Sequence, residues 1–127
     1  MQQAHLFEYA VVRIVPKVER EEFLNAGVIL YCAKLNFLQT MFCLSEERLR
    51  IFAPEIDSQV LQQNLDAFER ISVGDSDAGP IAKLDTAARF RWLTATRSTI
   101  VQTSKVHPGF CMDPAETLLR LYTQLVL

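Results

Sequence analysis

Strand-type composition is concentrated in the first third of the chain and constrains the fold more than any other feature. Phe7 to Val15 reads FEYAVVRIV, a run of β-branched and aromatic side chains that ends at Pro16. Two further apolar runs follow, Val28 to Cys32 and Phe37 to Leu44, with a few polar residues between them. The first run is apolar on both faces, which is typical of a central strand. The short connection between the other two predicts an antiparallel hairpin.

Helix signals dominate the rest of the chain. The exceptions are Ser98 to Ser104, which has strand composition, and Pro108-Gly109, which predicts a turn. N-terminal capping residues and the helical spacing of apolar side chains predict helices in four places. These are Ser45 to Phe52, a longer helix that begins at Asp57 or Ser58, Ala87 to Leu93 after a cap at Asp85 or Thr86, and Asp113 to the C-terminus.

Strands and helices do not alternate along the chain, which disfavours a doubly wound parallel sheet. We therefore expect an α+β fold, with an antiparallel sheet of about four strands and helices packed mainly on one face. The 127 residues suit a single domain, residues 1–127, and half of them are apolar, enough for a packed core.

Cysteine and charge patterns exclude some classes of protein. Cys32, Cys43 and Cys111 are far apart and form no CxxC motif, so we expect no structural zinc site and no bound cofactor. No signal peptide or apolar run long enough to cross a bilayer is visible, and we expect a cytoplasmic protein. The net charge of −2 gives no overall attraction to nucleic acid.

The segment Phe90 to Gly109 is the richest in polar side chains. It contains the one tryptophan, and its arginines Arg91 and Arg97 flank a predicted junction between helix and strand. Guanidinium groups bind phosphate or carboxylate in a two-point fashion, and Ser98 adds a hydroxyl donor. The alternative is that both arginines pair with acids such as Glu8 or Glu22 and only stabilise the fold. No phosphate-binding glycine motif is present.

Four other positions attract attention. Arg13 interrupts the first strand and requires a partner, because a buried unpaired charge is costly. Asn25 precedes the second strand and either contacts a ligand or makes a local turn hydrogen bond, and the local bond is the reading we favour. Gly27 predicts a positive φ or a close backbone approach. His107 is either a general base or a turn histidine, and the second is favoured.

Two blocks of these residues resemble the bacterial domain-of-unknown-function 3037 family. The first block is Glu22 to Leu30 (EFLNAGVIL), with Tyr9 and Arg13 upstream, and the second runs from Phe90 through Gln102 to His107. The resemblance implies a small cytoplasmic bacterial protein with no established activity. Genes of the family often lie beside that of a HipA-like kinase, which makes such a kinase a candidate partner.

The resemblance also selects the candidate ligand- or partner-binding residues. We expect Arg13, Asn25 and Arg97 to converge on one side of the sheet, and we predict no catalytic or metal-binding residue. The full set is Arg13, Glu22, Asn25, Arg91, Arg97, Ser98, Gln102 and His107.

Three functional hypotheses stay open. The first is a non-enzymatic accessory protein that binds a partner protein. The second is a module that binds a small anion, a nucleotide or nucleic acid through the segment from Arg91 to His107. The third is a small hydrolase or nuclease that uses His107 and a nearby carboxylate. The lack of a catalytic motif and the family context favour the first, so whether the chain is an enzyme is uncertain, with non-enzymatic binding preferred.

Overall fold

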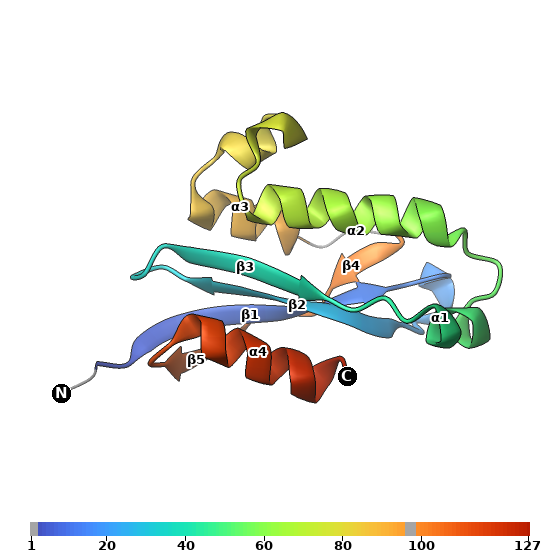
Figure 1. Ribbon diagram of the computed structural model, residues 1–127, viewed down its shortest axis with the longest axis horizontal. Helices are drawn as coiled ribbons and strands as arrows, with labels where there is room; N and C mark the ends of the chain where they lie inside the picture. The colour runs from blue at the N-terminus through green and yellow to red at the C-terminus, as the bar shows by residue number, and fades with distance from the viewer. Residues whose placement is uncertain (1–2, 96–98) are drawn as a thin grey trace.

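The computed structural model describes residues 3–95 and 99–127 and has one antiparallel sheet between helices on its two faces (Figure 1). The predicted α+β class is confirmed, and the sheet has five strands. The strands and α-helices are β1 (His5–Ile14), β2 (Leu24–Cys32), β3 (Phe37–Phe42), α1 (Glu46–Phe52), α2 (Ser58–Ser72), α3 (Thr86–Leu93), β4 (Val101–Thr103), β5 (His107–Cys111) and α4 (Pro114–Leu125), joined in part by the short 3-10 helices η1 (Val18–Arg20), η2 (Ser76–Ala78) and η3 (Ile81–Lys83).

The first strand is central, as its apolar composition predicted. The sheet order is β3-β2-β1-β4, and β5 also pairs with β1. Because β2 occupies one edge of β1, β4 and β5 share the other edge. β4 pairs with the end of β1 at Val12 to Ile14, and β5 pairs with its beginning at His5 to Tyr9.

A serine hydroxyl replaces part of the backbone ladder where β4 ends and β5 has not yet begun. The Ser104 N–H donates to the Val11 carbonyl (2.8 Å), and the Val11 N–H donates to Ser104 Oγ (2.8 Å). The same hydroxyl donates to the carbonyl of Lys105 (2.9 Å). Ser104 is buried, so no solvent is at hand to replace these bonds.

The sheet separates two apolar cores, because successive side chains of a strand point to opposite faces. On one face, Val12 and Ile14 of β1 pack with Leu61, Leu65 and Phe68 of α2 and with Phe90 and Leu93 of α3. On the other face, Phe7 of β1 and Val28 and Leu30 of β2 pack with Leu118 and Leu121 of α4. Figure 1 shows α2 and α3 on one side of the sheet and α4 on the opposite side.

The predicted N-terminal caps are confirmed at all four helices. Asp57 accepts from the N–H groups of Gln59 (2.9 Å) and Val60 (3.4 Å), and Asp113 accepts from those of Ala115 (3.0 Å) and Glu116 (3.5 Å). Ser45 and Asp85 cap α1 and α3. Such caps satisfy N–H groups that the first helical turn leaves unpaired.

The prediction of a turn at Pro108-Gly109 is wrong, since both residues lie within β5. Proline is tolerated in an edge strand, where its missing N–H removes no ladder bond inside the sheet. Gly109 is needed because a Cβ atom there would lie 2.6 Å from Cζ of Phe7, the residue opposite it on β1. The turn signal was therefore overridden by pairing with a strand about a hundred residues earlier.

Gly27 permits a close approach between strands rather than a positive φ. A Cβ atom at this position would lie 2.5 Å from the carbonyl oxygen of Met41 and 2.5 Å from Cδ1 of Phe42. The first of these is a backbone atom of the neighbouring strand, so the clash cannot be relieved by a rotamer change.

We expect Ser104→Ala to lower the free energy of unfolding by about 1–3 kcal/mol, because the buried Val11 N–H loses its acceptor. Equilibrium urea unfolding measures this. The matched control is Ser76→Ala on an exposed surface, which we expect to change stability by less than about 0.5 kcal/mol. Equal effects of the two changes would contradict the bridging role of the Ser104 hydroxyl.

We expect Gly27→Ala to destabilise the protein by about 1–3 kcal/mol, since the added methyl group forces β2 and β3 apart. Thermal unfolding followed by circular dichroism should show a lower Tm. Gln39→Ala, at an exposed position of the same hairpin, serves as the control and should leave Tm nearly unchanged. An unchanged Tm for Gly27→Ala would refute the close-approach argument.

Candidate binding site

Three of the predicted site residues meet at Arg13. Arg13 is directly opposite Asn25 of β2 and directly opposite Gln102 of β4. Directly opposite residues of antiparallel strands point to the same face of a sheet. This face is the one that α4 partly covers, because Phe7 lies at an alternate position on the same strand and packs in the α4 core. The expected convergence of Arg13 and Asn25 is therefore observed.

Arg13 is held by an aromatic ring rather than by an acid. The central carbon of its guanidinium group lies 3.9 Å from the centroid of the Phe23 ring, a cation–π contact. Its Nε atom is buried and has no hydrogen-bond partner among the residues that the structure describes. Stacking on Phe23 uses the face of the guanidinium plane, so the terminal N–H groups at its edge remain available to an acceptor.

A cavity of about 280 Å³ lies beside this group. Glu22, the fourth predicted residue to reach the site, lines it, but its carboxylate already accepts a hydrogen bond from Arg20 Nε. This hydrogen bond raises the pKa of Arg20. The cavity is lined by Arg13, Val15, Val18, Glu21, Glu22, Phe23, Gln102 and Thr103.

Asn25 has a structural role, but not through a local turn. Its Nδ2 donates to the carbonyl of Leu125 at the end of α4 (3.1 Å). Nearby, Arg48 Nη1 donates to the carbonyl of Val126 (3.0 Å). Carbonyl groups at a helix C-terminus have no intrahelical partner, and these two side chains supply donors for them. Asn25 therefore connects the Arg13 region of the sheet to α4.

The remaining predicted residues are more dispersed. His107 begins β5 opposite Tyr9, and the two rings lie 5.3 Å apart on the same face as Arg13. Arg91 is exposed on α3, which covers the opposite face. The segment from Arg91 to His107 thus contributes to both sides of the sheet. Arg97 and Ser98 lie outside the described residues, so the predicted convergence of Arg97 is not tested.

Phe23 is the site residue that sequence reasoning missed. It follows Glu21 and Glu22 in a charged segment and is 43% exposed. A large aromatic side chain between a charged turn and a strand was the available signal. Its contact with Arg13 depends on the return of the chain from β1 into β2, which no local pattern specifies.

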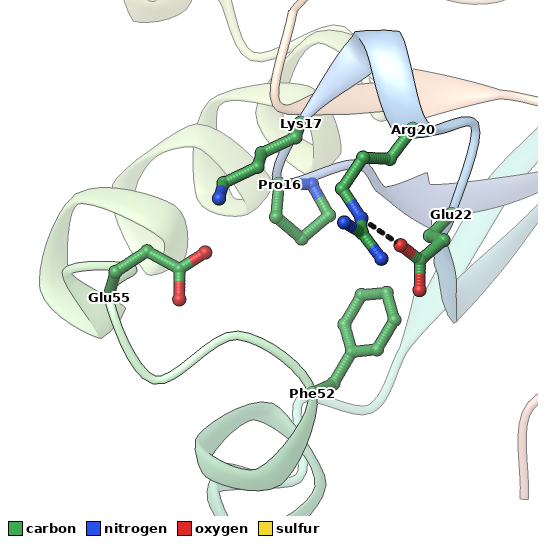
Figure 2. Close-up of a pocket in the computed structure, with 6 residues that line it drawn as sticks. All are labelled: Pro16, Lys17, Arg20, Glu22, Phe52 and Glu55. Carbon is green, nitrogen blue, oxygen red and sulfur yellow. Dashed lines mark hydrogen bonds and ion pairs between the residues drawn. The ribbon is translucent and has the colours of Figure 1, made fainter.

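A second cavity, of about 230 Å³, lies on the other side of Glu22 (Figure 2). Figure 2 shows the ion pair between Arg20 and Glu22 at its wall, with Lys17 and Glu55 across the opening. None of the described side chains that line this cavity has a buried donor without a partner, in contrast to the cavity beside Arg13.

No hydrogen bond joins His107 to a carboxylate or hydroxyl within residues 3–95 and 99–127. Burial raises the pKa of the Cys111 thiol, which keeps this group protonated. In the same residues no cluster of histidine, cysteine and acidic side chains could hold a metal ion. No helix there is long and apolar enough to cross a membrane.

Comparison with known proteins gives one match. Neither a curated protein nor a solved structure shows significant similarity to the chain. A family described as a protein of unknown function, DUF3037, matches residues 9–126, which include every residue of the Arg13 site. The chain therefore belongs to the DUF3037 family, as its two sequence blocks indicated.

Proposed function

We propose that this chain is a cytoplasmic bacterial accessory protein that binds a partner protein through the β5 edge of its sheet. The observation that carries the proposal is one pair of exposed apolar side chains. Phe110 of β5 is 74% exposed and directly opposite Leu6 of β1, which is 54% exposed. Apolar side chains grouped on a protein surface are typical of contacts with another protein.

The position of this pair makes it accessible. Leu6 and Phe110 lie on the same face of the sheet as α2 and α3. These helices pack over β2, β3 and β4, whereas Leu6 and Phe110, where β5 pairs with β1, remain exposed. Met112, which follows β5, is 53% exposed and extends the apolar surface. We call Leu6, Phe110 and Met112 the β5 surface.

Side chains rather than backbone pairing would make this contact. β5 pairs with β1 on one side, and no described strand pairs with its other side. Such an edge can accept an additional strand, but Pro108 has no N–H to donate and interrupts the ladder. A partner that packs an apolar surface over Phe110 suits this edge better than one that adds a strand. The HipA-like kinase suggested by the family context is the partner we propose to test first.

We expect Phe110→Ala to weaken capture of the HipA-like kinase roughly tenfold or more, because central aromatic residues contribute most of the binding energy of an interface. A HipA-like kinase of the native host would be quantified by mass spectrometry after affinity purification of the tagged full chain at high salt. At 74% exposure, Phe110 can be truncated with little effect on folding.

The matched control is Ile51→Ala, which removes a similarly exposed apolar side chain (80%) from α1. The control should capture as much kinase as the unchanged protein. Equal capture by the Phe110→Ala protein, or an equal loss from Ile51→Ala, would overturn the proposed surface. Absence of the kinase from the unchanged protein's sample would overturn the proposed partner.

A further inference from the structure

We infer that the cavity beside Arg13 is a receptor for a single carboxylate group. This site is independent of the β5 surface, because Arg13 and Leu6 point to opposite faces of the sheet. The inference rests on an unpaired donor, on the rigidity of the group that bears it, and on the charges around it.

The unpaired donors are the terminal N–H groups of Arg13, which make no hydrogen bond or ion pair with a described residue. They are not buried atoms, whereas the neighbouring Nε is buried, also lacks a partner and is out of reach of a ligand. A carboxylate can accept from both terminal nitrogens of the same guanidinium at once. This two-point contact is the geometry for which arginine is best suited.

The guanidinium is held in place before any ligand arrives. The Phe23 ring covers one of its faces at 3.9 Å, and its backbone lies between β2 and β4 in the sheet. Gln102, directly opposite, is itself anchored by a bond from its Nε2 to the carbonyl of Thr99 (2.8 Å). A group that is already ordered loses little conformational entropy on binding, which favours a small ligand.

The charges around the cavity select a single negative charge. Glu21 and Glu22 line the same cavity as Arg13, and Arg20 compensates only Glu22. The Glu21 carboxylate makes no ion pair within the described residues. A dianion such as phosphate would bring a second negative charge near Glu21, whereas a carboxylate brings only the one charge that Arg13 contacts. The repulsion from Glu21 disfavours nucleotides and nucleic acid at this site.

The size of the cavity fits a small group. About 280 Å³ is less than most sites for drug-sized molecules offer. Val15, Val18 and Phe23 provide an apolar wall beside the cation. The carboxylate can therefore belong to a free small molecule or to an acidic side chain of a peptide, and the experiment below separates these two sources.

The test follows the Arg13 guanidinium through the resonance of its Nε–H, which lies next to the terminal N–H groups. Proton–nitrogen NMR of the labelled full chain at constant ionic strength records this resonance. The probes are sodium acetate, N-acetyl-aspartate N-methylamide and inorganic phosphate. We expect both carboxylates to shift the Arg13 Nε–H resonance saturably, and phosphate to bind more weakly. If N-acetyl-aspartate N-methylamide binds more tightly than acetate, the ligand is an acidic side chain of a peptide. If acetate binds as tightly or more tightly, the ligand is a free small carboxylate. No saturable shift with either carboxylate, or phosphate binding as tightly, would overturn the inference.

Two substitutions complete the test. Arg13→Lys keeps the charge but loses the planar fork of terminal N–H groups, so the affinity for carboxylate should fall roughly tenfold. This affinity would be measured from backbone amide shifts near Gln102. Glu21→Gln removes a repulsive charge and should strengthen binding. Arg91→Lys, on the other side of the sheet, should change nothing. If the Arg13→Lys protein does not fold, the Glu21→Gln protein serves as the test. Unchanged or weaker carboxylate binding by the Glu21→Gln protein would refute the proposed charge selection.

Discussion

The pairing of β1 on both of its edges is the constraint on which the rest of the structure depends. β1 bonds to β2 along one edge, and β4 and β5 divide the other edge between them. The two short strands stay in register because Ser104 supplies a side-chain acceptor where the ladder is interrupted. Without that bridge, the buried N–H of Val11 would lack a partner in the centre of the sheet. Both the β5 surface and the position of Gln102 opposite Arg13 follow from this arrangement.

The two faces of the sheet are covered differently, and the candidate sites follow from that difference. α2 and α3 pack over β2, β3 and β4 and leave Leu6 and Phe110 exposed at one corner. α4 packs over β2 and β3 and is connected to the sheet by Asn25. The polar residues of β1 and β4 on that face are therefore not covered by a helix core. Arg13 is stabilised there by the face of Phe23, which orders the guanidinium without neutralising it.

Sequence reasoning identified many of the right residues but few of their contacts. Arg13, Glu22, Asn25 and Gln102 were selected from sequence blocks that are well separated along the chain, and the fold brings them together. Arg13 was expected to need a partner, and the partner is an aromatic ring rather than a charged side chain. The bond of Asn25 to Leu125 spans a hundred residues, so no local turn pattern could reveal it. Arg91 shares a sequence block with Gln102 but lies on the opposite side of the sheet.

The sequence by itself determined which segments become helices and strands, since capping, side-chain periodicity and β-branched composition act over a few neighbouring residues. Asp57 and Asp113 begin their helices, and the β-branched run from His5 to Ile14 forms a strand, for these local reasons. Only the tertiary structure decided that Pro108 and Gly109 extend a strand and that Phe23 stacks on Arg13. Those outcomes depend on contacts between distant segments, whose free energy is gained only when the whole sheet has formed.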